Sequence, residues 1–152
     1  RRWRKQLSKN QKHQNRRTII VSGGFDPIHI GHIRLILDAA KYGDVIAVAN
    51  SDDWLMRKKG YVFMPFKERC EVLESIKGVI TAEGVDDADN TVCEALERLK
   101  PDMFGNGGDR IVGNTPEQLA CKALGIDMVF GLGGSKIQSS SDLVEKSGCK
   151  PE

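Results

Sequence analysis

Short apolar runs typical of strands alternate with helical patterns along almost the whole chain, and this alternation constrains the fold more than any other feature. The expected strands are residues 18–21, 45–49, 79–80, 102–104 and 126–130. The expected helices, in most of which apolar residues recur every three or four positions, are residues 30–40, 66–76, 91–99, 115–124 and 139–144. Strands and helices that alternate through short connections form a parallel sheet with helices on both faces. We therefore expect a single doubly wound α/β domain with a five-stranded parallel sheet.

Residues that commonly begin helices stand at the start of three of these segments. Thr91 followed by Glu94 fits a capping box, in which each side chain accepts from the other residue's backbone N–H. Thr115 and Gln118 have the same spacing. Ser139 is expected to cap the last helix. These residues place the expected helix starts near positions 91, 115 and 139.

The charged residues divide the chain into two unlike parts. Residues 1–17, the basic arm, hold eight of the 23 Lys and Arg residues and none of the 21 Asp and Glu residues. The rest of the chain therefore carries 15 basic and 21 acidic residues, a net charge of −6. We expect a basic N-terminal extension over residues 1–17, one domain over residues 18–148 and a short tail over residues 149–152.

The basic arm has two interpretations. Its eight positive charges could neutralise several phosphates of a nucleic acid, with binding that weakens steeply as salt rises. Trp3 is its only aromatic residue, however, and nothing else in the chain suggests a DNA-binding or RNA-binding fold. A solvated tail is the favoured interpretation, and contact with nucleic acid is the alternative.

Composition excludes several classes of protein. With 39% hydrophobic and 29% charged residues, the chain is neither disordered nor collagen-like. No apolar run approaches the roughly 18 residues that a membrane span needs, so no membrane partner is expected. The cysteines contain no C-x-x-C pair, and their sparse spacing indicates a reducing compartment; they are Cys70, Cys93, Cys121 and Cys149. We expect a cytoplasmic protein.

The loop after the first expected strand, residues 22–32, concentrates the chemistry. In a doubly wound sheet, ligands bind beyond the carboxyl ends of the strands, where the strand order reverses. Gly23 and Gly24 let the backbone turn and approach a ligand closely, and the helix that follows directs unpaired N–H groups to the same place. His29 and His32 lie near one face of that helix start. A metal site is an alternative, but two histidines without a nearby carboxylate favour an anion, most simply phosphate.

The string from Gly24-Phe25-Asp26 to His29-Ile30-Gly31-His32 resembles the GxFDxxHxGH signature of the cytidylyltransferase-like nucleotidyltransferases. Four further segments resemble this family in the same order; they are residues 50–54, 58–60 with 65–69, 100–102 with 107–110, and 137–141. The resemblance spans about residues 18–146. It implies that the expected doubly wound domain has a Rossmann-like fold.

The resemblance also implies a reaction. A phosphate oxygen of a small sugar phosphate or polyol phosphate attacks the α-phosphorus of a nucleoside triphosphate, and pyrophosphate leaves. The acceptor is already anionic, so no enzyme nucleophile is required, and catalysis consists of positioning and charge stabilisation. Mg²⁺ would accompany the nucleotide, with no protein ligand assigned to it. Relatives of this type are often homodimers, and a homodimer is expected here.

The transferred nucleotide has two candidates. The general signature favours CMP from CTP, whereas the loop at residues 107–110 is similar to that of heptose-1-phosphate adenylyltransferases, which use ATP. A function of a different class is a catalytically silent module that binds nucleotide or nucleic acid. An aminoacyl-tRNA synthetase shares a similar histidine motif, but the short length and the absence of a KMSKS-like loop argue against it.

The resemblance assigns roles to individual residues. The expected catalytic residues are His29 and His32, as donors to the phosphoryl oxygens, with Lys59 and Arg69. The expected nucleotide-binding residues are Gly23, Gly24, Phe25, Asp26, Asp109, Arg110, Ser139, Ser140 and Ser141. The expected residues for the phosphorylated substrate are Lys58, Asp52, Trp54 and Lys136.

Several of these assignments have structural alternatives. Arg69 could form an ion pair with Glu68 or Glu71 instead of binding phosphate, and the serine run could serve only to cap its helix. The two adjacent lysines could be solvated loop residues. Lys136 stands where many cytidylyltransferases have an arginine, and a lysine lacks the planar fork that binds phosphate with two N–H groups.

Overall fold

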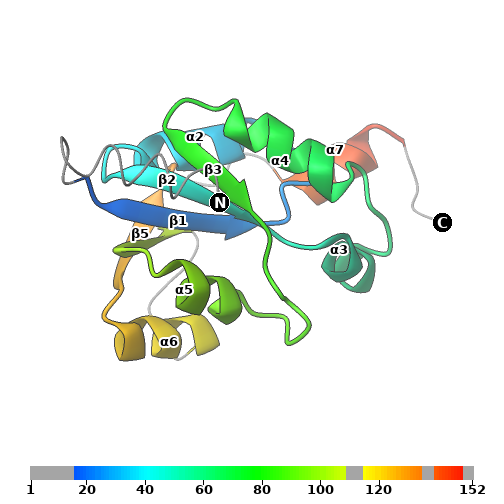
Figure 1. The fold of residues 1–152 in the computed structure, drawn as a ribbon. Coiled ribbons are helices and arrows are strands. Elements are labelled where there is room, and N and C mark those ends of the chain that lie inside the picture. Colours follow the sequence, from blue (N-terminus) through cyan, green and yellow to red (C-terminus); the bar gives the residue numbers. More distant parts are fainter. Residues whose placement is uncertain (1–15, 109–114, 135–138, 149–152) are drawn as a thin grey trace.

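The computed structural model describes residues 16–108, 115–134 and 139–148. Its strands form one five-stranded parallel sheet in the order β3-β2-β1-β4-β5 (Figure 1). The strands are β1 (Thr18–Gly23), β2 (Asp44–Ala49), β3 (Val79–Glu83), β4 (Met103–Gly107) and β5 (Asp127–Leu132). The helices are α2 (Ile30–Ala39), α3 (Asp52–Lys59), α4 (Phe66–Glu74), α5 (Cys93–Leu99), α6 (Pro116–Leu124) and α7 (Ser140–Lys146). The Rossmann-like, doubly wound fold is confirmed.

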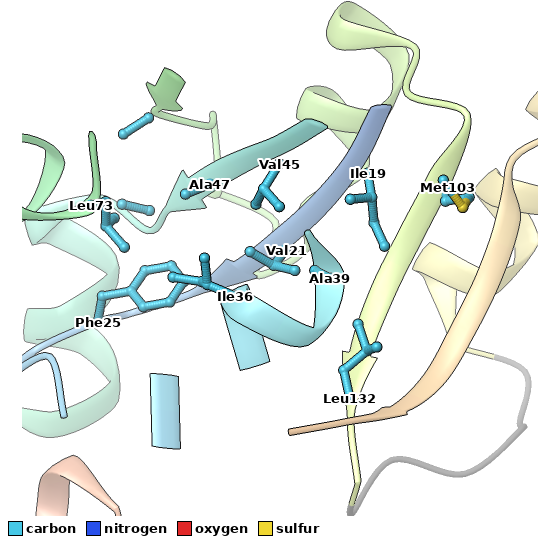
Figure 2. Close-up of a cluster of buried hydrophobic side chains, with 12 residues drawn as sticks. Ile19, Val21, Phe25, Ile36, Ala39, Val45, Ala47, Leu73, Met103 and Leu132 are labelled. Carbon is cyan, nitrogen blue, oxygen red and sulfur yellow. The ribbon is translucent and has the colours of Figure 1, made fainter. Parts of the chain in front are cut away.

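Helices cover both faces of the sheet because successive residues of each strand point to opposite faces. Val21 of β1 points toward Ile36 of α2, in a core cluster that also includes Leu73 of α4 (Figure 2). Its neighbour Ile20 lies in a second cluster with Leu96 of α5. Residues 19–21 of β1 and 45–49 of β2 are therefore apolar and buried without interruption, which is the pattern that identified these strands in the sequence.

The strand order reverses beside β1. The chain builds β2 and β3 on one side of β1 and then returns to place β4 and β5 on its other side. The carboxyl end of β1 consequently opens onto the crevice in which doubly wound proteins bind ligands. The expected site loop, residues 22–32, leaves the sheet at this point.

One helix was absent from the sequence expectation. Helix α3 occupies Asp52–Lys59, a segment to which no helix or strand was assigned from the sequence. The Ser51 side chain accepts from the Trp54 N–H at its start, and Gly60 ends it in a left-handed conformation with φ 83°. Acidic residues in the first turn and basic residues in the last turn stabilise the helix by interacting with its dipole. These are ordinary start and stop signals, and they could have identified the helix.

The expected capping box at Thr91 is wrong. Helix α5 begins at Cys93, and the Thr91 hydroxyl accepts only from the Cys93 N–H, at 3.3 Å. The Glu94 carboxylate accepts instead from the Asp86 N–H and from Arg98. The Asp86 backbone and the Arg98 side chain, one turn along the same helix, have therefore taken the carboxylate that the box required. The box of Thr115 and Gln118 is present at the start of α6.

The last two residues of the basic arm lie against the domain. Arg16 forms an ion pair with Asp44, and Arg17 forms one with Asp127 at 2.8 Å. The Arg17 carbonyl also accepts from the Asp44 N–H, so backbone pairing extends into the arm. The boundary between arm and domain stays a prediction. In the part of the chain that the structure describes, no helix has the length and apolar character needed to cross a bilayer.

Candidate active site

The two motif histidines cap helix α2 reciprocally. His29 precedes the helix, and its Nδ1 atom accepts from the Gly31 N–H at 3.0 Å. The Nδ1 atom of His32 accepts from the His29 N–H at 3.2 Å, and the two rings stack with centroids 3.9 Å apart. A neutral imidazole whose Nδ1 accepts must carry its proton on Nε2. Helix geometry therefore makes each ring a donor through Nε2.

His32 is held in the neutral form. Burial, followed by the proximity of His29 and Lys59, lowers the pKa of His32 from 6.5 to about 3. The edge of the ring also meets Phe25, with centroids 5.0 Å apart. At neutral pH His32 can therefore donate a hydrogen bond but cannot serve as a general acid.

The glycines of the motif permit close packing at the end of β1. A Cβ atom on Gly24 would lie 3.1 Å from Leu55 and 3.5 Å from the Trp54 ring. Trp54, expected near the substrate, thus packs beside the motif. Phe25 follows with φ 51° and a fully buried side chain, so only its backbone can face a ligand. The Gly23 carbonyl accepts from the Asn50 N–H, which joins the ends of β1 and β2.

Asp26 departs from its expected role. Its side chain is fully buried, and its two carboxylate oxygens accept from the backbone N–H groups of Phe63 and Met64. Since both oxygens are engaged inside the protein, the side chain does not fit the expected contact with nucleotide. It anchors the connection between α3 and α4 to the motif instead.

Lys59 lies against the motif, whereas Lys58 lies farther out. The Lys59 ammonium donates to the Asp26 carbonyl at 2.8 Å. Burial lowers its pKa; the Asp26 charge opposes this shift and the Arg69 charge adds to it. Lys58 is exposed, with its ammonium 5.7 Å from the centre of the Trp54 ring. The structure therefore brings Lys59 to the histidines' side of the site. This position favours Lys59 over Lys58 as the lysine for the acceptor phosphate.

Arg69 is also placed differently from the expectation. Its side chain is fully buried, and it donates to the carbonyls of Gly24 and Asn50, each at 2.8 Å. It donates further to the Met64 carbonyl. With these bonds inside the protein, Arg69 does not fit a phosphate clamp. It joins the ends of β1 and β2 to the α3–α4 connection.

The ion-pair partner of Arg69 is Asp52, at 2.7 Å. The alternatives named from the sequence, Glu68 and Glu71, are exposed residues of the same helix. Asp52 was expected to contact substrate, and the structure uses one of its oxygens to fix the first turn of α3.

The serine run is tied to the motif from the other side. The Ser139 hydroxyl caps α7 by accepting from the Asp142 N–H, so its capping alternative is confirmed. Ser140 donates to the Pro27 carbonyl at 2.8 Å, and Ser141 is exposed. The start of α7 therefore lies beside the loop after β1. The expected contacts of these serines with phosphate stay predictions.

A second contact near the site, between α2 and the end of β5, was not predicted from the sequence. The Asp38 carboxylate of α2 accepts from the Gly133 N–H at 2.7 Å, and the Lys41 ammonium and this N–H both lower its pKa. A Cβ on Gly133 would lie 3.0 Å from the Leu35 nitrogen, so only glycine lets the strand end approach the helix so closely. Three expected site residues, Asp109, Arg110 and Lys136, lie outside the described residues.

A sequence model of the family described as cytidylyltransferase-like matches residues 20–141, from β1 into α7. The chain belongs to the cytidylyltransferase-like family. The resemblance carried by residues 24–32 is thereby confirmed, as is the expectation of a nucleotidyltransferase at the level of the family.

Two curated relatives illustrate the range of this family. The chain is 31% identical over 135 residues to bifunctional protein HldE of Desulfatibacillum aliphaticivorans, which covers 86% of this chain and 25% of that protein. It is 33% identical over 92 residues to FAD synthase of Ferroglobus placidus, which covers 60% of this chain and 59% of that protein. The matches thus span a quarter of one relative and about three fifths of the other.

A solved structure agrees with the fold. The lipopolysaccharide core biosynthesis protein from Thermoplasma volcanium GSS1 superposes with a TM-score of 0.65. The alignment covers 82% of this chain and 100% of that chain at 24% identity. At that identity the likeness concerns the arrangement of strands and helices.

Proposed function

We propose that the protein transfers a nucleoside monophosphate from a nucleoside triphosphate to the phosphate of a small sugar or polyol phosphate, with release of pyrophosphate. The observation that carries the proposal is the reciprocal cap of His29 and His32, which makes both rings Nε2 donors at the start of α2. Family membership supplies the class of reaction. The donors and the N–H groups of the helix suit a phosphate chain better than a neutral ligand.

In this reaction an oxygen of the acceptor phosphate attacks the α-phosphorus, and the bond from that phosphorus to the bridging oxygen of pyrophosphate breaks. His29 and His32 donate to the phosphoryl oxygens as charge develops on them. Lys59, held on the Asp26 carbonyl, supplies a positive charge for the acceptor phosphate. No proton needs to leave the attacking oxygen, so a neutral His32 is the suitable form.

Mg²⁺ fits this scheme as a companion of the nucleotide. Among the residues that the structure describes, no three His, Cys, Asp or Glu side chains are grouped so that they could hold a metal ion. An ion that is carried by phosphate oxygens and water, as Mg²⁺ commonly is, does not require a cluster of this kind. When bound, it would offset the charge of the triphosphate and of the departing pyrophosphate.

For the nucleotide, the relatives shift the balance toward ATP. The general motif favours CTP, but one relative is named FAD synthase, and FAD contains an AMP moiety. The segment Gly107-Gly108-Asp109-Arg110 also leans toward the adenylyl branch. ATP is therefore the first donor to test and CTP the second.

The test is a screen of pyrophosphate release, with four nucleoside triphosphates against sugar phosphates, polyol phosphates and flavin mononucleotide. We expect release to require both one triphosphate and one acceptor. Release without any acceptor, or saturable triphosphate binding without release in every pair, contradicts the proposal. The second of these results is the one expected of a silent nucleotide-binding module.

A further inference from the structure

A buried aspartate outside the motif connects the loop after β3 to helix α3. Asp87 is 4% exposed. One of its carboxylate oxygens accepts from the Asn50 amide at 3.1 Å and from the Ser51 N–H at 2.8 Å, and the other accepts from the Ser51 hydroxyl at 2.6 Å. Its carbonyl accepts from Arg57, on α3, at 2.8 Å. The side chain of Asp87 therefore binds the segment that begins α3, and its backbone binds Arg57 in the last turn of that helix.

These contacts determine how α3 starts. The Ser51 hydroxyl caps the helix by accepting from the Trp54 N–H at 3.0 Å, while its proton goes to Asp87. The carboxylate thus orients the hydroxyl so that its lone pair faces the helix. A hydrogen bond to an ionised group is stronger than a neutral one, so the cap is held firmly. At the other end of α3, Lys59 donates to the Asp26 carbonyl.

The same network reaches the glycine motif. Asn50, whose amide binds Asp87, donates its backbone N–H to the Gly23 carbonyl at 2.9 Å. The Asn50 carbonyl accepts from Arg69, which also binds the Gly24 carbonyl. Asp87 is therefore one residue removed from the loop that carries the histidines. An aspartate in a solvated loop would make none of these contacts.

We propose that Asp87 is a positioning residue: through Ser51 and Asn50 it fixes α3 against the glycine motif and so places Lys59 for the acceptor phosphate. This inference rests on the proposed function. Asp87 itself touches neither substrate. Its loss should loosen the position of α3 and weaken phosphate binding at Lys59 while the histidines at the start of α2 keep their reciprocal cap.

The experiment measures binding of inorganic phosphate, used as a stand-in for the acceptor, through the fluorescence of Trp54 in a Trp3→Phe background. Asp87→Asn replaces the carboxylate that accepts three hydrogen bonds with an amide. We expect the dissociation constant for phosphate to rise about tenfold, which is the effect of losing one hydrogen bond to a charged group. Asp86→Asn, at the exposed neighbouring aspartate, is the matched control and should leave it unchanged.

Ser51→Ala is the second variant, because it removes the hydroxyl that Asp87 orients while leaving the Asn50 bond in place. It should also weaken phosphate binding. In an active enzyme, both variants should raise KM for the acceptor about tenfold and leave KM for the triphosphate within about twofold. If Asp87 and Ser51 had only a structural role, the variants would lower the melting temperature and the fraction of active protein. The KM values for the acceptor and the triphosphate would then not change by different factors.

The two hypotheses fail differently. Unchanged phosphate binding in a folded Asp87→Asn protein, or equal changes in both KM values, overturns the positioning role. Absence of saturable phosphate binding in the parent protein overturns it as well. A parent that binds phosphate but transfers no nucleotide to any acceptor overturns the proposed function, and the binding comparison still decides the role of Asp87.

Discussion

At the scale of single residues, His29 and His32 use different atoms of the same ring for folding and for the proposed chemistry. Nδ1 of each ring accepts a backbone N–H and caps α2, which leaves Nε2 as the protonated nitrogen. The two requirements select the same tautomer. A substitution can therefore separate them only if it keeps an acceptor at the position of Nδ1.

His32→Gln and His32→Ala form such a pair. Glutamine at this position can still accept the His29 N–H, as in an ordinary capping box, whereas alanine cannot. We expect both variants to lose about 10²–10³ in the rate of pyrophosphate release, because neither keeps the imidazole Nε2–H at its position facing the phosphoryl oxygens. Only His32→Ala should also lose about 1 kcal/mol in urea unfolding. A near-normal rate in either variant contradicts the assigned role.

The buried imidazole also predicts a pH dependence of stability. The pKa of His32 is about 3 in the folded protein against an ordinary value of 6.5, so the unfolded chain binds this proton more tightly. The contribution is complete above pH 6.5 and is lost as pH falls toward 3. Between pH 7.5 and 5, we expect the parent to lose about 2 kcal/mol more unfolding free energy than His32→Gln, because over this range the unfolded chain takes up the proton and the folded protein does not. Equal losses would argue against a neutral, buried His32.

Arg69 provides the prediction that distinguishes a structural residue from a phosphate clamp. Arg69→Met leaves the carbonyls of Gly24 and Asn50 and the Asp52 carboxylate without their donor. We expect the free energy of unfolding to fall by about 3 kcal/mol, since buried groups lose their partners. Lys67→Met, at an exposed position of the same helix, should change it little. A stable Arg69→Met protein with weakened phosphate binding would restore the original expectation.

At the scale of elements, a helix start depends on whether its capping groups are free to act. Thr115 and Gln118 bind each other reciprocally at the start of α6, with the Thr115 hydroxyl 3.2 Å from the Gln118 nitrogen, and the box forms as the sequence predicts. At α5 the equivalent carboxylate, Glu94, binds Arg98 at 2.7 Å. A sequence pattern identifies the candidates for a cap, and competition from other partners, here Arg98 one turn along the same helix, decides between them.

This contrast can be measured by paired substitutions. Thr115→Ala removes a complete capping box and should lower the unfolding free energy by about 1 kcal/mol. Thr91→Ala removes a hydroxyl that accepts the Cys93 N–H at 3.3 Å and donates to the exposed Asp89 carboxylate, and its effect should be below about 0.5 kcal/mol. Urea unfolding of the two variants against the parent gives the comparison. Equal costs would mean that Thr91 caps α5 after all.

At the scale of the whole molecule, the charge division in the sequence continues in the structure. Arg16 and Arg17, at the end of the basic arm, form ion pairs with Asp44 and Asp127 of the acidic domain. Such exposed pairs contribute little to stability on their own. Among the described residues, those of the proposed site come from the loop after β1, from α3 and from the start of α7.

Deleting residues 1–15 should therefore leave the melting temperature and the rate of pyrophosphate release close to those of the full chain. Nucleic-acid affinity, measured over a salt series, should be weak and should not differ between the two forms at physiological salt if the arm is a solvated tail. A steep salt dependence that disappears on deletion would establish the alternative. Light scattering of both forms also tests the expected homodimer.

The fold and the motif could be predicted because their signals are local. Strand and helix periodicities extend over fewer than about 12 residues, and residues 22–32 contain the whole histidine motif. Helix α3 was not predicted although Ser51 and Gly60 mark its ends, because the helix buries only Leu55 and so lacks a repeating apolar stripe. The roles of Asp26 and Arg69 could not be predicted in the same way, since a carboxylate or guanidinium in a motif suits both a ligand and a backbone partner.

By itself, the sequence determined the α/β class, the five parallel strands, the position of the motif beside the reversal point and the family of the chain. Tertiary structure decided which polar side chains remain for a ligand. Arg69 meets Gly24 across 45 positions, and Asp87 meets Asn50 across 37 positions. Burying a charged group is unfavourable unless it finds such partners, and only the folded chain brings them within hydrogen-bonding distance.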